Sequence, residues 1–185
     1  QTLSAGDGLN PGEMHDWVCA KTGYVCPRGA MALPKPGHPN KYLLFHMGAR
    51  YDPVRKLTYG PFYYTAIDMA LNGGNGVVTE KNLLLTDGDL EPFTAVRHGN
   101  GRDWWLVVPV YATAGYRIFL LNPHGISGPF VQHIGPEMNC RRIGTSVFSR
   151  NGQKFAHAQN CQVLVMDFDR CAGVFSNPQL LDLPD

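Results

Sequence analysis

The chain has 185 residues, of which 44% are hydrophobic and only 17% are charged, and its formal net charge is +1. This length is enough to bury a sizeable core, and the low charge excludes a chain kept disordered by self-repulsion. Because the chain is nearly neutral and Arg141-Arg142 is its one pair of adjacent arginines, we expect no nucleic-acid partner.

Short runs rich in aromatic and β-branched residues, bounded by Gly, Pro, Asn or Asp, predict an all-β protein. The 21 glycines and 14 prolines favour many turns and short strands. No helical periodicity persists along the chain. Residues 60–74 read as a strand followed by a turn, because three consecutive aromatic residues precede an Asn-Gly-Gly turn.

The turns recur with a period of about fifty residues. Asn100-Gly101 and Asn151-Gly152 each separate two apolar runs, and a second class of turn recurs at Gly74, Gly125 and Gly173. Each repeat therefore reads as four antiparallel strands. The predicted strands are residues 29–33, 42–47, 62–68 and 77–85, then 94–98, 104–111, 116–121 and 130–134, then 144–148, 155–158, 162–168 and 178–183.

Four-stranded antiparallel units of this length are typical of β-propeller blades. We expect a lead segment over residues 1–28 and a propeller-like array of three blades over 29–89, 90–137 and 138–185. Because a propeller closes with about four to eight blades, these three form part of a larger ring, completed by further sequence or by other chains. An open array of stacked sheets is the third option.

The chain has five cysteines, and their spacing does not match a zinc site. They are Cys19, Cys26, Cys140, Cys161 and Cys171. The first two flank a loop-like segment, which allows a local disulfide. If Asn151-Gly152 is a hairpin turn, Cys140 and Cys161 lie on its two strands, within about two residues of being directly opposite each other. This predicts a second disulfide between them and leaves Cys171 free. The alternative is five reduced thiols in a cytosolic protein.

Five phrases resemble large secreted β-propeller proteins of Bacteroidetes: GDGLNPG (residues 6–12), ALPKPG (32–37), IDMALNGG (67–74), RHGNGRDWW (97–105) and DFDRC (167–171). The resemblance covers nearly the whole chain. It implies WD40-like repeats and export to the cell surface or medium by type IX secretion, with no assigned reaction.

The sequence departs from that family's pattern at both ends. Residues 1–20 lack a signal-peptide pattern, and the earlier repeats and the sorting domain are missing, which favours a fragment. The longest apolar run, residues 104–112, is too short to span a membrane.

The densest polar cluster surrounds one predicted hairpin and comprises Arg97, His98, Asn100, Arg102, Asp103, Trp104 and Trp105. Indole faces together with an Arg–Asp pair suit a platform for glycan or peptide. In the structural alternative, the adjacent tryptophans point to opposite sheet faces, while His98 and Asp103 hydrogen-bond across the turn.

Two groups of carboxylates stand out. Asp87 and Asp89, in a glycine-containing loop with Glu91, are candidate calcium ligands, although the loop lacks the EF-hand pattern and also suits a solvated acidic turn. Asp167 and Asp169 lie two residues apart on one strand face, like a glycosidase pair, or else mark the strand end and pair with arginine.

No nucleophile motif or paired histidines occur.

We therefore predict a non-catalytic, secreted or cell-surface scaffold or binding module for protein or glycan, with partner contacts made by loops. The predicted binding residues are Trp17, Tyr51, Tyr59, Arg102 and Trp105. One alternative is a polysaccharide hydrolase or lyase with His98 or Asp103 as acid or base. Another is a subunit of an extracellular assembly whose exposed sheet edges pair with other chains.

Overall fold

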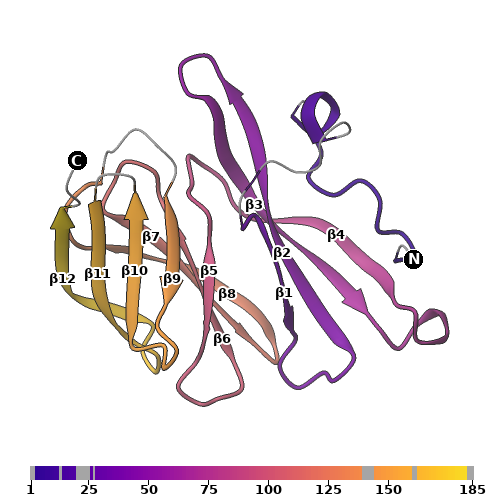
Figure 1. The fold of residues 1–185 in the computed structure, drawn as a ribbon. Coiled ribbons are helices and arrows are strands. Elements are labelled where there is room, and N and C mark those ends of the chain that lie inside the picture. The colour runs from indigo at the N-terminus through magenta and orange to yellow at the C-terminus, as the bar shows by residue number, and fades with distance from the viewer. Residues whose placement is uncertain are drawn as a thin grey trace. The chain divides into compact units, whose positions relative to one another are not determined.

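The computed structural model describes residues 3–12, 14–19, 26, 28–138, 144–159 and 162–182, without the side chains of Val18 and Cys19. The chain divides into two compact units, an N-terminal unit Gln1–Asp89 and a C-terminal unit Leu90–Asp185. The described strands form three four-stranded antiparallel sheets, and in each sheet the strands follow chain order (Figure 1). This confirms the predicted all-β class and the three four-stranded sheets.

The N-terminal unit holds one sheet of β1 (Ala30–Pro34), β2 (Lys41–Asp52), β3 (Lys56–Asp68) and β4 (Val77–Thr86). Strands β2 and β3 are much longer than predicted, and most of residues 48–61, which lie between the predicted strands 42–47 and 62–68, pair as a hairpin with a tight turn. Residues 49–59 pair only with each other, so this part of the hairpin extends beyond β1 and β4 (Figure 1). We call residues 49–59 the arm.

The base of the arm lies against the loop that follows β4. Gly60 has a φ of 128°, and a Cβ at this position would overlap the carbonyl oxygen of Gly88. Only glycine accommodates both the conformation and the contact. Below it, the rings of Phe45 and Phe62 stack with centroids 6.1 Å apart and are fully buried.

The C-terminal unit holds two sheets. The first contains β5 (Thr94–Arg97), β6 (Trp104–Pro109), β7 (Gly115–Asn122) and β8 (Gly125–His133), and the second contains β9 (Thr145–Phe148), β10 (Lys154–Gln159), β11 (Gln162–Asp169) and β12 (Val174–Asp182). The two predicted Asn-Gly turns connect β5 to β6 and β9 to β10. The second hairpin has the predicted register, with Phe155 opposite Phe148.

Strands β8 and β12 begin earlier than predicted, because each continues through a proline. Pro129 lies inside β8 and Pro178 inside β12, whereas the sequence placed the strand starts at Phe130 and Pro178. Both are outermost strands of their sheets. An edge strand tolerates proline, since its outward N–H groups have no ladder partner to lose.

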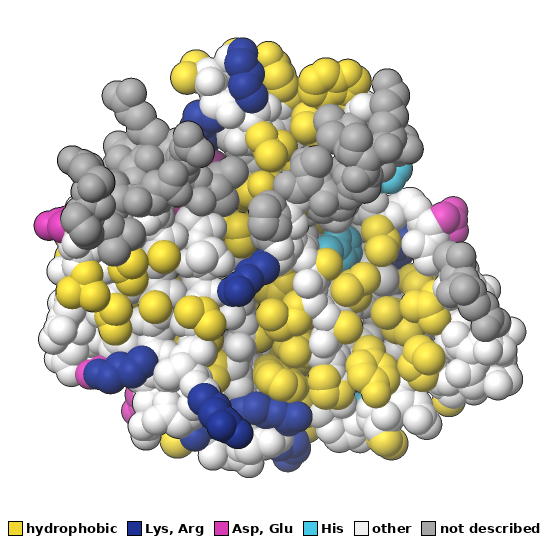
Figure 2. Space-filling view, viewed as in Figure 1, with side chains coloured by type: hydrophobic (Ala, Val, Ile, Leu, Met, Phe, Trp, Pro, Cys, Tyr) yellow, Lys and Arg dark blue, Asp and Glu magenta, His cyan; other side chains and the backbone are white. Residues whose placement is uncertain are grey.

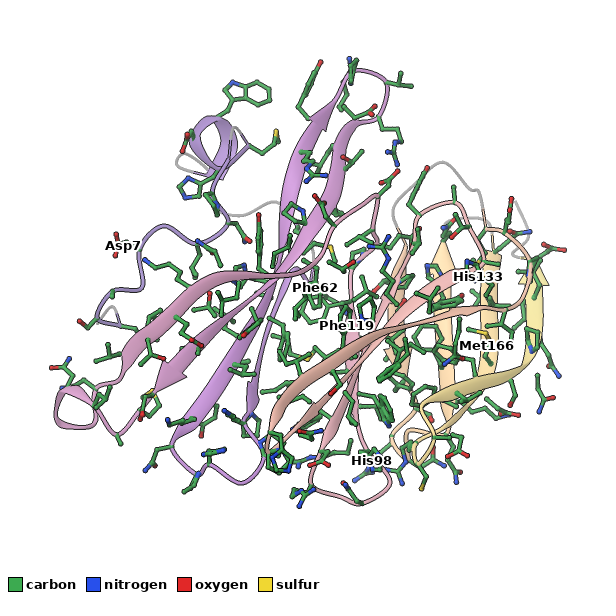
Figure 3. All side chains as sticks on the ribbon, turned by 180° about the vertical axis from the view of Figure 1, so that it is seen from behind. Asp7, Phe62, His98, Phe119, His133 and Met166 are labelled. Atoms are coloured by element: carbon green, nitrogen blue, oxygen red, sulfur yellow. The ribbon has the colours of Figure 1, made fainter. Side chains whose placement is uncertain are left out.

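The two sheets of the C-terminal unit share one core. Trp105 and Tyr116 of the first sheet meet Phe155 and Phe168 of the second, with Tyr116–Phe155 centroids 5.9 Å apart and nearly perpendicular rings. Met166 lies in the same core (Figure 3). Large aromatic side chains that interlock edge to face favour one packing arrangement of the sheets.

The described helices are short. A π-helix, η1, covers His15–Cys19, and a 3-10 turn, η2, covers Asn72–Gly74. No helix among the described residues is long and apolar enough to cross a membrane. Residues 60–68 belong to β3, in agreement with the predicted strand.

Candidate functional site

The arm presents exposed apolar side chains on a well-fixed turn. Tyr51 is 52% exposed and Val54 is 87% exposed. The carboxylate of Asp52 accepts the backbone N–H groups of Val54 and Arg55 at 2.9 and 2.7 Å, and these bonds lower its pKa. Lys56 Nζ lies 5.9 Å from the centre of the Tyr51 ring. The arm tip therefore offers an aromatic ring, an aliphatic group and a cation together.

Two ion pairs tie the arm to the loop after β4. Arg50 Nη2 lies 2.6 Å from Asp87 Oδ2, and Arg55 Nη2 lies 2.5 Å from Asp89 Oδ2. These carboxylates are the candidate calcium ligands, and a calcium ion here would have to displace both guanidinium groups. Among the residues that the structure describes, no group of three or more His, Cys, Asp or Glu side chains is placed to hold a metal ion.

The other aromatic candidates of the N-terminal unit differ in exposure. Trp17, on η1, is 64% exposed, whereas Tyr59 is buried at the base of the arm. The Tyr59 hydroxyl shares a hydrogen bond with the Cys26 thiol, and burial raises the pKa of each group to about 12. Tyr51 and Trp17 can therefore meet a partner at the surface, and the Tyr59 ring fills the interior.

The turn between β5 and β6 is held by a compact polar network. The Arg102 guanidinium donates to the Asp103 carboxylate from Nε at 2.7 Å and from Nη2 at 3.1 Å. The Asn100 side chain donates to the same carboxylate at 2.9 Å. The hydrogen bonds from Arg102 lower the pKa of Asp103 most, and the hydrogen bond from Asn100 lowers it further. His98 Nδ1 accepts the backbone N–H of Asn100 at 3.0 Å. The polar groups of His98 and Asp103, the weak catalytic candidates, thus hold the turn.

The two adjacent tryptophans lie on opposite faces of β6. Trp105 is 5% exposed, stacks on His98 and donates its indole N–H to the Arg170 carbonyl at 2.8 Å (His98 is labelled in Figure 3). Trp104 carries the Arg97 guanidinium 4.0 Å above its ring. Of the binding candidates here, the Arg102 side chain is exposed, and the Trp105 ring is part of the core.

The carboxylates near the end of β11 are also occupied. Asp167 forms an ion pair with Lys154, rather than with an arginine, and accepts the Asn177 amide at 2.8 Å. Asp169 accepts the backbone N–H groups of Cys171 and Ala172 at 2.7 and 3.2 Å. The two groups therefore serve local structure.

One of the two predicted disulfides falls outside what the structure describes. Cys140 and Cys161 lie outside the described residues, so their pairing stays a prediction. Cys26 is a buried thiol that bonds to the Tyr59 hydroxyl, so the predicted Cys19–Cys26 disulfide is wrong for this structure. Cys171 is an exposed thiol.

A buried polar cluster in the C-terminal unit escaped sequence reasoning. Glu91 precedes β5, and its carboxylate bonds to His157 Nε2 and accepts the Gln159 amide at 2.7 Å. A Cβ at Gly144 would lie 2.6 Å from Glu91 Oε2 and 2.8 Å from His157 Nε2, so the glycine leaves room for the pair. The sequence gives little indication of this pair, because a single histidine and a loop glutamate that are far apart in the chain do not form a recognisable motif.

A second buried network connects the lead segment to the sheet of the N-terminal unit. His46 Nδ1 lies 2.6 Å from Asn10 Oδ1, and His46 Nε2 lies 2.9 Å from Thr65 Oγ1. Burial lowers the pKa of His46 to about 4, so the ring is neutral at pH 7. It donates to the Asn10 oxygen and accepts the Thr65 hydroxyl, which in turn accepts the backbone N–H of Asn82 at 3.2 Å.

No protein-family model and no curated protein matches the chain. Among solved structures, the chain is similar to the periplasmic gluconolactonase PpgL of Pseudomonas aeruginosa, with a TM-score of 0.42 and 9% sequence identity. The match covers 80% of this chain and 39% of the gluconolactonase chain. The chain thus spans well under half the length of that protein.

Proposed function

We propose that this chain is a non-catalytic scaffold and binding module for protein or glycan, built from propeller-like blades that belong to a larger ring. The observation that carries the proposal is a difference between the two sheets of the C-terminal unit. In the first sheet, strands β6 and β7 are buried on both faces, whereas in the second sheet strands β10 and β11 are buried on one.

Burial along the strands shows this difference. In β5–β8, Trp105 and Ile118 are buried on one face, and Leu106 and Phe119 are buried on the other (Phe119 is labelled in Figure 3). In β9–β12 the buried side chains of Phe155, Leu164 and Phe168 lie in the shared core. The opposite face, which we call the outer face, carries Val147, Ala156, Ala158, Val163, Val165 and Leu181, none of them buried.

The outer face suits another sheet. Its apolar residues are aliphatic and lie opposite one another across the strands, with Val147 beside Ala156 and Val163 beside Leu181. Val147 and Leu181 are 50% and 53% exposed. Contiguous exposed apolar surface of this kind marks an interaction site, and a propeller blade buries it against the next blade.

The edges formed by β4, β8 and β12 are less suited to pairing with other chains. The outermost strand β4 has three register irregularities, and β8 and β12 contain Pro129 and Pro178. Bulges and prolines on edge strands discourage edge-to-edge addition. Assembly through the outer face is therefore favoured over the edge-pairing alternative.

The binding role rests on the exposed side chains of the N-terminal unit. Tyr51 and Val54 on the arm and Trp17 on η1 are the exposed side chains that we assign to partner contacts. The contacts of His98 and Asp103 within their turn support a non-catalytic role for both. Export to the cell surface, by the type IX route, is part of the same proposal and rests on the sequence resemblance alone.

Light scattering after size exclusion tests the scaffold proposal on the 185-residue chain. We expect the wild type to associate as its concentration rises and to bind the dye ANS, because the outer face is apolar. Val147→Lys should reduce both signals. Leu84→Lys, which changes a similarly exposed residue of β4 (58%), should leave them unchanged. A wild-type chain that stays monomeric and binds no dye would overturn the proposal.

A further inference from the structure

We propose that one end of the C-terminal unit binds an acidic polysaccharide, with Arg150 and Arg170 as its principal contacts. The end is formed by the turns at residues 98–103, 149–153 and 170–173, and we call it the basic end. The inference rests on the proposed binding role and deepens it by naming a ligand class and a second surface.

The three turns are in direct contact. The backbone N–H of Gly99 donates to the Arg170 carbonyl at 2.9 Å. A Cβ at Gly152 would lie 2.6 Å from both Arg170 Cδ and Val96 Cγ2. The Arg170 stem therefore lies against Gly152, two residues from Arg150.

The basic end has more cations than carboxylates. Arg97, Arg102, Arg150, Lys154 and Arg170 lie on or beside these turns, against Asp103, Asp167 and Asp169. Figure 2 shows Lys and Arg side chains gathered at the lower end of the view, where the β5–β6 hairpin turns.

The carboxylates at this end are already engaged. Asp103 is bound by Arg102, Asp167 by Lys154, and Asp169 by backbone N–H groups. Among the described residues, no carboxylate forms an ion pair with Arg97, Arg150 or Arg170. Arg97 is held over Trp104 and donates to the carbonyls of Gly101 and Arg102. Arg150 and Arg170 are therefore the guanidinium groups best placed to meet an external anion.

The chemistry favours a chain of carboxylates over a nucleic acid. A guanidinium group binds a carboxylate through two parallel N–H···O bonds. Two such groups on separate turns match anions repeated along an extended polymer. Proteins that hold single-stranded nucleic acid also stack its bases on aromatic rings. Here Trp105 is buried and Arg97 covers the Trp104 ring, which leaves neither indole free for a base.

Isothermal titration with polygalacturonate, a polymer of uronic acids, tests the proposal, with neutral dextran as the control ligand. We expect polygalacturonate to bind and dextran not to bind. Arg150→Gln/Arg170→Gln should raise the Kd by about tenfold or more. Arg28→Gln/Lys41→Gln removes the same charge from exposed positions of the N-terminal unit and should change the Kd less than about twofold.

Three results would overturn the proposal: wild-type protein that does not bind polygalacturonate, equal weakening by the two double variants, or oligo(dT) binding as tightly as polygalacturonate. Thermal unfolding of each variant checks its fold, and Arg150→Glu repeats the test at an exposed side chain. The outer-face experiment measures self-association, so failure of the scaffold proposal is distinguishable from failure of this one.

Discussion

Glu91 and His157 are 66 residues apart, yet their side chains form a hydrogen-bonded pair with side-chain exposures of 1% and 4%. Glu91 belongs to the segment before β5 and His157 to β10, so the pair links the two sheets of the C-terminal unit. A buried polar pair of this kind makes the packing of the sheets depend on both partners.

Removing either partner should destabilise the C-terminal unit. We expect His157→Ala to lower the free energy of unfolding by about 3–5 kcal/mol, because it leaves the Glu91 carboxylate buried with fewer partners. Urea unfolding measures the loss. Glu91→Leu/His157→Phe should recover part of it, since an apolar pair leaves no orphaned charge. A loss below about 1 kcal/mol for His157→Ala would contradict this role.

Gly144→Ala should also destabilise the protein. The added methyl group would lie within 2.6–2.8 Å of Glu91 Oε2, His157 Nε2 and the Ala158 carbonyl oxygen, and overpacking of this kind costs about 1–3 kcal/mol. The effect should be smaller in a His157→Ala background, because the ring is gone. Equal losses in the two backgrounds would show that the glycine serves the backbone alone.

The N-terminal unit should lose stability in mild acid through His46. Its pKa is lowered from 6.5 to about 4 in the folded chain, so the folded state prefers the neutral ring. Above pH 6.5 the neutral ring makes its full contribution to the free energy of unfolding. That contribution, about 3 kcal/mol in total, is lost as the pH falls from 6.5 toward 4. Unfolding free energies measured over that range should show a shallower pH dependence for His46→Gln. His124→Gln, at an exposed position, is the control, and a slope unchanged by His46→Gln would refute the assignment.

Trp105→Phe should cost more than Trp104→Phe. Trp105 loses a hydrogen bond to the Arg170 carbonyl and part of a buried ring, and we expect a loss of about 1–2 kcal/mol. The indole N–H of Trp104 has no hydrogen-bond partner among the described residues, so its replacement should cost less. Differential scanning calorimetry compares the two variants, and the reverse order would count against the packing role of Trp105.

The local features of the fold were predictable because they depend on neighbouring residues. Asn100-Gly101 and Asn151-Gly152 predict hairpin turns, since Asn and Gly adopt the required backbone conformations, and both glycines have a φ of 72°. The alternation in β10 and β11 predicts which side chains share a face. The arm was missed, because Asp52-Pro53 resembles an ordinary loop until the paired strands on both sides are seen.

The all-β class, the four-strand repeat and the Asn-Gly turns could be predicted from the sequence, because strand propensity and turn chemistry act over a few residues. Tertiary packing brings Glu91 to His157 and Asn10 to His46, and it makes Tyr59 and Trp105 interior rather than surface rings. Those outcomes depend on how segments far apart in the chain pack together, and burial and hydrogen bonding between them leave no local pattern to read.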